Sequence, residues 1–147
     1  MSSRVIVNSI RHTGASVDGI TLDSSGNFST NGSITATGTI TDSKGNIRKI
    51  IISSKSSAYT LVAADAGKAI YISTGGVTVP NAVFSAGDAI TIINNSGSSQ
   101  TITQGTNVTM YNTADAATGN RALAGRGMAT MYFVDSSTAY ISGSGLS

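Results

Sequence analysis

The chain has 147 residues and no cysteine, so it can hold one domain with a core, or a small domain with an arm, but no disulfide or thiolate metal site. Its net charge is +2, yet only 11% of its residues are charged, and Lys and Arg are scattered except at Arg48-Lys49. Nucleic-acid binding needs a dense basic face, which this sequence lacks. A membrane span or a signal peptide needs a long apolar run, which it also lacks. We therefore expect no nucleic-acid partner and no membrane partner. The absence of cysteine fits synthesis in a cytoplasm.

The composition indicates an all-β protein. Ser, Thr and Gly dominate, Glu is absent and there is one proline. Thr, Val, Ile and Tyr favour strands, whereas the usual helix formers are scarce.

Residues 1–52 are predicted to form an extended, hairpin-rich N-terminal arm that serves assembly or attachment. The expected strand segments are short and carry few bulky side chains, and isolated hairpins are marginally stable. The arm must therefore pack on the second half of the chain or intertwine with the arms of other subunits. The segments are 5–10, 20–22, 33–36, 39–41 and 47–52.

A turn phrase occurs twice within this arm. Asp23-Ser24-Ser25-Gly26 and Asp42-Ser43-Lys44-Gly45 both place Asp first and Gly fourth. This order is typical of a type I turn, in which the Asp carboxylate accepts hydrogen bonds from the backbone ahead of it and Gly takes a positive φ. Apolar or β-branched residues on both sides predict two hairpins. A calcium loop is the alternative, but it needs several more oxygen ligands.

Residues 53–57 are predicted to be a joint, followed by a small β-sandwich or jelly-roll over 58–147. Alternating apolar residues and turn signals every eight to twelve residues support this architecture. We expect strands at 59–61, 69–72, 77–79, 89–93, 100–103, 108–110, 128–134 and 139–141, with 112–127 as one long loop containing a helical turn near 114–117. The inward-facing residues should be Ile70, Ile72, Val79, Ile90, Ile92, Met131 and Phe133.

No set of residues predicts catalysis. His12, the only histidine, lies in the arm, and each of the seven Asp residues occupies a turn-like position. The segment from Ala63 to Ala69 lacks both defining positions of a phosphate loop, so it predicts a tight turn capped by Asp65. Met110, Met128 and Met131 are expected to fill the core. We expect no enzymatic activity, catalytic residue, cofactor or metal site.

The second half resembles a β-rich module of tailed-bacteriophage virion proteins. The resemblance covers residues 58–145. It lies in Tyr59-Thr60-Leu61-Val62-Ala63-Ala64-Asp65-Ala66-Gly67-Lys68, Val77-Thr78-Val79-Pro80, Phe84-Ser85-Ala86-Gly87-Asp88-Ala89-Ile90-Thr91-Ile92, Arg126-Gly127 and Ala139-Tyr140-Ile141-Ser142-Gly143. Tyr140 stands where that family often has Trp. The arm is similar to the starts of virion proteins from marine and freshwater phages, in Val7-Asn8-Ser9-Ile10-Arg11-His12-Thr13-Gly14 and Ile20-Thr21-Leu22-Asp23-Ser24-Ser25-Gly26.

The resemblance implies a structural role in the virion, and it transfers no catalytic residue. Together with the absence of cysteine, it leads us to expect a virion protein made in the cytoplasm of a host bacterium. A head decoration (cement) protein is favoured, because 147 residues leave little room for the attachment, shaft and tip of a fibre. A short tail fibre is the first alternative. A carbohydrate-binding module is the second, although most aromatic residues lie in strand patterns that can bury them.

The expected partners are other copies of the chain, as a homotrimer, and the major capsid protein or another virion protein. Uncovered apolar residues of the arm would bury surface in such contacts, and closed symmetry would avoid runaway strand pairing; the choice of three copies comes from the resemblance. Arg121 and Arg126 are expected to pair with local Asp residues or with a partner's acidic groups. The candidate interface comprises Val5, Val7, Ile10, Arg11, His12, Ile20, Leu22, Ile34, Ile40, Arg121 and Arg126.

Overall fold

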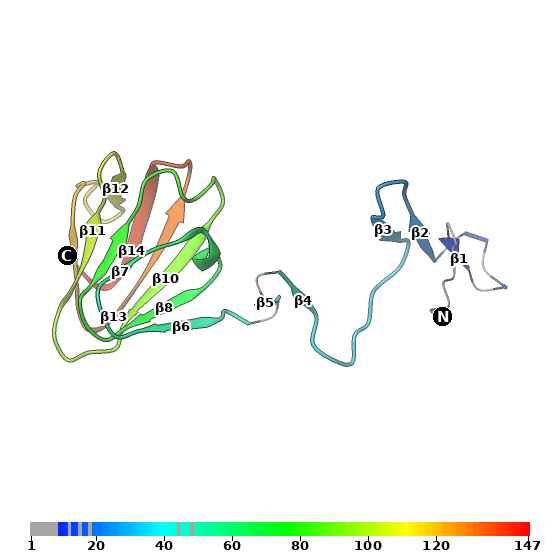
Figure 1. Cartoon of the computed structure of the whole chain (residues 1–147), viewed down its shortest axis with the longest axis horizontal. Coiled ribbons are helices and arrows are strands. Elements are labelled where there is room, and N and C mark those ends of the chain that lie inside the picture. Colours follow the sequence, from blue (N-terminus) through cyan, green and yellow to red (C-terminus); the bar gives the residue numbers. More distant parts are fainter. Residues whose placement is uncertain (1–8, 12, 15, 18, 44, 48) are drawn as a thin grey trace, which may run out of the picture. The chain divides into compact units, whose positions relative to one another are not determined.

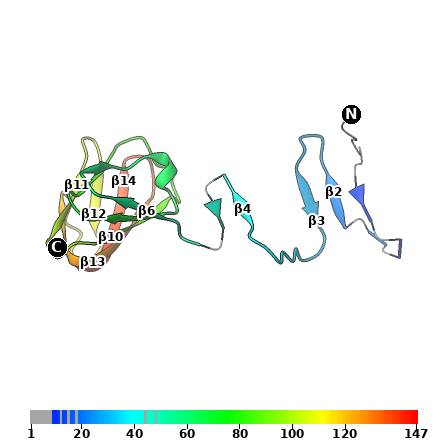
Figure 2. The ribbon, with the colours of Figure 1, turned by 60° about the horizontal axis from the view of Figure 1, so that its bottom comes forward.

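The structure is a computed structural model that describes residues 9–11, 13, 14, 16, 17, 19–43, 45–47 and 49–147. The chain divides into two compact units, Met1–Thr39 and Ile40–Ser147. Figure 1 shows the elements of each unit along the chain, and Figure 2 shows them from a second direction. The all-β fold class is confirmed, because the described residues form fourteen strands and one short 3₁₀ helix.

The N-terminal unit contains a small antiparallel sheet of three strands: β1 (Ser9–Ile10), β2 (Ile20–Leu22) and β3 (Phe28–Thr30). The predicted turn of Asp23 joins β2 to β3. The Asp23 carboxylate accepts hydrogen bonds from the backbone N–H of Ser25 at 2.8 Å and of Asn27 at 2.9 Å, and Gly26 has a φ of +82°. The first repeat of the turn phrase therefore forms the predicted hairpin.

The second repeat also lies in a hairpin, made of β4 (Thr41–Asp42) and β5 (Gly45–Asn46). Its turn includes Lys44, which lies outside the described residues. The strand expected at 33–36 does not form; these residues have no regular structure. The segment offers only Ile34 and small or polar residues, too little for a fourth strand to bury.

The C-terminal unit begins its main sheet earlier than predicted. Residues 53–57 were expected to be a joint, but β6 (Ile52–Lys55) pairs along β8 (Ala69–Ile72), which in turn pairs with β10 (Ala89–Asn94). All three strands are parallel. Pairing with the apolar β8 places the Ser-rich β6 in the sheet despite its weak strand propensity.

A second parallel stack follows the same chain direction. It contains β7 (Tyr59–Thr60), β9 (Val77–Val79) and β11 (Gln100–Gln104). Because β7, β9 and β11 follow β6, β8 and β10 in turn, the chain alternates three times between the two stacks (Figure 1).

The long strand β13 (Arg121–Phe133) joins the stacks into one nearly closed sheet. Its first half pairs with β11 and its second half with β10, both antiparallel. It also pairs with β14 (Thr138–Leu146), and β14 pairs with β12 (Thr109–Asn112). The register of β13 shifts between Leu123 and Met128, where Arg126 has a φ of +63°. Such a bulge bends a strand and lets it serve two differently oriented neighbours.

The loop predicted over 112–127 is therefore wrong for its second part, which is strand. The Gly- and Arg-containing stretch from Arg121 to Gly127 has little strand propensity of its own, and pairing with β11 and β14 overrides it. Near the helical turn expected at 114–117, residues 113–115 form a single hydrogen-bonded turn, closed by the Ala116 N–H donating to Asn112 O at 2.8 Å.

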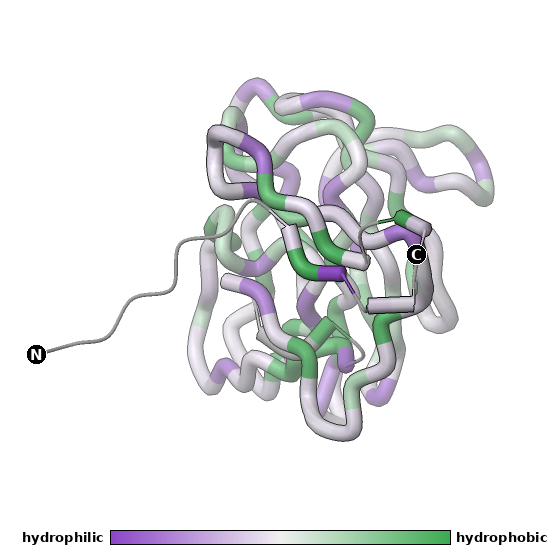
Figure 3. The backbone as a smooth tube through the Cα atoms, turned by 90° about the vertical axis from the view of Figure 1, so that its right-hand side faces the viewer, coloured by the Kyte–Doolittle hydropathy of each residue, from purple (hydrophilic) through white to green (hydrophobic). Residues whose placement is uncertain are grey.

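One core lies between the inner faces of the sheet. All seven residues predicted to face inward are at most 1% exposed. Phe133 stacks on Phe84 with ring centroids 4.4 Å apart. Met110 and Met131 fill this core as predicted, whereas Met128 is 52% exposed on the outer face. Figure 3 shows hydrophobic and hydrophilic positions following one another along the chain, the pattern expected when alternate side chains face a core.

Candidate functional site

Three of the predicted interface residues gather around one hollow on the N-terminal unit. Ile10 pairs with Ile20 across β1 and β2, and Ile34 lies beside them; with Thr30 and nearby glycines they line an open hollow of about 490 Å³. Ile10 is 59% exposed and Ile34 is 63% exposed. Apolar side chains at this exposure leave surface that association would bury.

The other interface candidates fall into different environments. Leu22 and Arg11 are exposed, and Ile40 is half-buried. Val5, Val7 and His12 lie outside the described residues. Phe28, which sequence reasoning did not select, is 61% exposed opposite Leu22. The sequence gives no sign of this exposure, because Phe28 lies on the far side of a predicted hairpin turn, where neighbouring residues could bury it.

The two candidate arginines do not pair with Asp in the described part of the chain. Arg126 donates from Nη1 to Oδ1 of Asn95 at 2.7 Å. Arg121 is only 9% exposed and faces the interior opposite Ile102, with its Nε sealed from solvent and without a partner among the described residues. The expectation that both lie in a loop and bind local Asp is wrong. Their contact with a partner's acidic groups stays a prediction.

A second apolar surface covers the outer face of the β6–β8–β10–β13 layer. It surrounds a shallow hollow of about 350 Å³. The lining side chains share one property, the lack of charge, and come from adjoining strands and the segment before β6: Ile50, Ile52, Ala69, Thr91, Ile93, Met128 and Thr130. We call this set the outer-sheet patch.

The register explains why these side chains meet. Ile52 pairs with Ala69, Ala69 with Thr91, and Thr91 with Thr130, which places them in one row across four strands. The Thr91 and Thr130 hydroxyls are 3.2 Å apart and bond to each other. Ile52 is 62% and Ile50 is 68% exposed. Sequence reasoning placed both in an arm strand, although the run of Ile50, Ile51 and Ile52 signals apolar residues on both faces.

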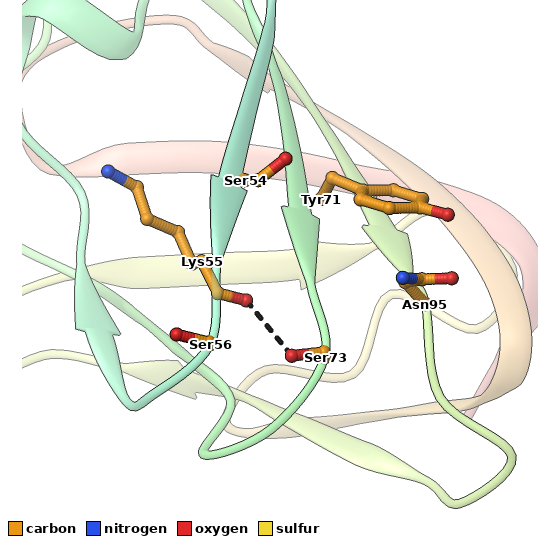
Figure 4. Close-up of a pocket in the computed structure, with 6 residues that line it drawn as sticks. All are labelled: Ser54, Lys55, Ser56, Tyr71, Ser73 and Asn95. Carbon is orange, nitrogen blue, oxygen red and sulfur yellow. Dashed lines mark hydrogen bonds between the residues drawn. The ribbon is translucent and has the colours of Figure 1, made fainter.

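A third hollow, of about 260 Å³, is polar and brings a lysine close to several serines. Figure 4 shows the Lys55 side chain directed away from the Ser54 and Tyr71 side chains. The Lys55 Nζ lies 3.8 Å from the Tyr59 ring centroid, and the Ser73 hydroxyl donates to the Lys55 backbone carbonyl at 3.3 Å. A serine nucleophile requires a base within hydrogen-bond reach, and Figure 4 shows none among the six residues drawn.

Asp65 serves structure, as the sequence predicted. It ends the 3₁₀ helix η1 (Ala63–Asp65), and its Oδ2 accepts from the Val62 N–H at 2.9 Å and from the Tyr59 hydroxyl at 2.8 Å. Burial, followed by the hydrogen bond to and charge of Asp65, raises the pKa of Tyr59 to about 12. The carboxylate is therefore occupied in closing the turn.

The part of the chain that the structure describes contains no group of three or more His, Cys, Asp or Glu residues placed to hold a metal ion. It also contains no helix that is long and apolar enough to cross a membrane.

Comparison of the chain with protein-family models, with curated protein sequences and with solved structures finds no match.

Proposed function

We propose that this chain is a non-enzymatic structural protein of a bacteriophage virion, and more specifically a head decoration (cement) protein that stabilises the capsid. The observation that carries the proposal is the presence of uncovered, uncharged apolar surface on both units. The hollow of Ile10, Ile20 and Ile34 lies on one unit and the outer-sheet patch on the other. The resemblance of residues 58–145 to phage virion proteins supports a role for these surfaces in assembly of the virion.

Association supplies a physical reason for such surfaces. Burying about 100 Å² of apolar surface at each exposed isoleucine would contribute about 2.5 kcal/mol per side chain. Among the described residues of the N-terminal unit, the three-stranded sheet has no second layer to provide this burial. Its partners in the proposal are other copies of the chain, as a homotrimer, and the major capsid protein or another virion protein.

The test removes the N-terminal unit at the boundary that the structure gives. Deletion of residues 1–39 leaves β6 and the whole main sheet intact, whereas deletion of 1–52 would remove the first residue of β6. We expect the truncated chain to stay folded by circular dichroism. We also expect it to lose trimer formation in light scattering and binding to capsids that lack the protein.

Two triple variants, one in each unit, provide a matched test in the full-length chain. Ile10→Ser, Leu22→Ser and Ile34→Ser remove apolar surface from the N-terminal unit, and Val62→Ser, Tyr132→Ser and Val134→Ser remove exposed surface of similar character from the C-terminal unit. Only the first set should weaken capsid binding. Full binding by the truncated chain, or equal loss in both triple variants, would contradict attachment through the N-terminal unit.

The same particles separate the two virion roles. A short tail-fibre protein should bind purified tails and leave capsid stability unchanged. A decoration protein should bind heads and raise the temperature at which they release DNA, and binding confined to tails would replace decoration with the fibre role.

A further inference from the structure

The strands at the opposite end of the layer from β6 carry a cluster of tyrosines. Tyr111 of β12 pairs with Tyr140 of β14, and Tyr140 pairs with Tyr132 of β13, so the three side chains lie in one row across adjacent strands. The Tyr111 and Tyr140 rings stack with centroids 5.3 Å apart and an interplanar angle of 26°. Tyr140 is 44% exposed and Tyr132 is 49% exposed. The expectation that strand patterns bury most of the aromatic residues does not hold for this row.

The stacked pair borders an open hollow of about 490 Å³, lined by Tyr111, Asn112, Thr113, Ala116 and Tyr140. Backbone hydrogen bonds fix its wall. The Asn112 N–H donates to Ala117 O at 2.8 Å, the Ala116 N–H to Asn112 O at 2.8 Å, and the Thr113 N–H to Ile141 O at 3.0 Å. The hollow is therefore formed before any ligand binds, which reduces the ordering cost of binding.

Hydroxyl groups supply the hydrogen-bonding capacity of this lining. Thr113, Tyr111 and Tyr140 each carry a hydroxyl that can donate and accept. Asn112 also belongs to the lining, but it is 6% exposed at an inward position of β12, and its Oδ1 accepts from the Ala114 N–H at 3.3 Å.

We propose that this hollow binds a neutral saccharide, with a pyranose ring against the tyrosine pair. Ligand sites combine aromatic walls with a few polar groups that fix orientation. A pyranose matches both, since its C–H faces pack on aromatic rings and its hydroxyls bond to amides and hydroxyls. The lining has no Lys, Arg, Asp or Glu, which disfavours phosphate-bearing and acidic ligands.

The site shares no lining residue with the two proposed assembly surfaces. The outer-sheet patch lies on β6, β8, β10, β13 and the segment before β6, whereas the hollow lies on β12, β14 and the turn after β12. A substitution in the hollow therefore changes no residue of either assembly surface.

The experiment titrates the full-length chain with soluble neutral oligosaccharides: maltohexaose, cellohexaose, xylohexaose and hexa-N-acetylchitohexaose. The chain has five Tyr and no Trp, and two of the five, Tyr111 and Tyr140, line the hollow. Tyrosine fluorescence therefore detects binding, and amide chemical shifts locate it. We expect one or more of these probes to bind with a Kd on the order of 1 mM. We expect chemical-shift changes to centre on residues 111–116 and 140.

Three variants sharpen the result. Tyr140→Ala should weaken binding about tenfold or more, whereas Tyr71→Ala, an outward tyrosine of β8 that does not line this hollow, should leave it unchanged. Ala116→Leu should project a larger side chain into the hollow while leaving both rings in the sequence, and so block binding. Because Ala116 has a φ of +58°, the thermal stability of this variant is measured alongside its binding. This third variant keeps the test valid if Tyr140→Ala disturbs the fold.

The proposal is overturned if none of the four saccharides binds at about 10 mM, a concentration well above the expected Kd. It is equally overturned if Tyr71→Ala weakens binding as much as Tyr140→Ala, or if Ala116→Leu binds normally. Salt-sensitive binding of heparin fragments in this hollow would replace the neutral ligand with an acidic one.

Discussion

The inward-facing isoleucines of the C-terminal unit differ in exposure from the isoleucines around the hollow of the N-terminal unit, although both sets occupy strands or strand-like segments. Ile70, Ile72 and Ile90 of the C-terminal unit are at most 1% exposed, whereas Ile10 and Ile34 of the N-terminal unit are about 60% exposed. The difference lies in the number of layers. The main sheet bends so that its inner faces cover each other. The sheet of β1, β2 and β3 has strands of two or three residues and is a single layer within the described part of its unit.

Apolar residues in strands therefore do not by themselves define a core. In the C-terminal unit the inward-facing apolar residues form a core, whereas those of the outer-sheet patch, and several in the described part of the N-terminal unit, stay exposed. Each of the following substitutions tests one side of that difference.

The largest effect is expected from truncating a core aromatic residue. Phe133→Ala removes a ring that is 1% exposed and stacked on Phe84. It should lower the free energy of unfolding by about 3–5 kcal/mol in urea denaturation. Phe28→Ala is the matched control in the N-terminal unit, where the ring is 61% exposed, and it should change that free energy by less than about 0.5 kcal/mol. Equal effects would show that Phe28 has a cover of its own.

The next effect concerns the two aspartates that close turns. Asp65→Ala leaves the Val62 N–H and the Tyr59 hydroxyl without their shared acceptor, and should destabilise the C-terminal unit by about 1–3 kcal/mol. Asp65→Asn retains an acceptor oxygen and should cost less. Asp23→Ala opens the β2–β3 turn and should not shift the main unfolding transition. A shift of similar size in both would mean that the two units unfold together.

A smaller effect should appear at high pH. The Tyr59 pKa is raised to about 12 from an ordinary value of 10.0, so the folded state holds this proton more tightly than the unfolded state does. The resulting stabilisation is complete below the unfolded pKa and is lost as the pH rises from about 10 to about 12. Tyrosinate absorbance should show one late-titrating tyrosine, which disappears in Tyr59→Phe. Titration of every tyrosine in a single step near pH 10 would contradict this assignment.

The smallest effect is confined to the N-terminal unit at low pH. Hydrogen bonds from the Asn27 side chain and backbone, with further bonds from Ser25 and Gly26, lower the pKa of Asp23 below its ordinary 3.8. Its contribution to the hairpin is present above the unfolded pKa and is lost as the pH falls through the lower folded value. Carboxyl chemical shifts should place Asp23 below a free Asp. An Asn27→Ala variant should bring it closer to the ordinary value, and an unchanged titration curve would argue against the Asn27 contribution.

Sequence reasoning succeeded where the signal was local. The alternation through Ile70 and Ile72, and again through Ile90 and Ile92, predicted the inner face of the main sheet. The Asp-first, Gly-fourth order predicted the β2–β3 turn. Both depend on residues within a few positions of one another.

It failed where pairing partners lie far apart in the chain. The start of β13 at Arg121 depends on β11 and β14, and the inclusion of β6 depends on β8. The alternation of apolar and polar residues within one strand does not reveal whether its neighbours run parallel or antiparallel to it. Ile10, Ile20 and Ile34 were selected from the sequence as interface candidates, and the structure brings them together at one hollow. The outer-sheet patch and the tyrosine row were not predicted, because both exist only once strands are placed side by side.

The position of β13 late in the chain bears on how the protein is made. β10 and β11 both find their antiparallel neighbour in residues 121–132, and β13 in turn needs β14. Long-range pairings of this kind slow folding, because the intervening loop must close before any contact rewards it. A nascent chain that has emerged only as far as β12 still presents the open edges of both stacks. The main sheet should therefore be completed after β14 is synthesised, and deletion of residues 138–147 should trap an aggregation-prone chain.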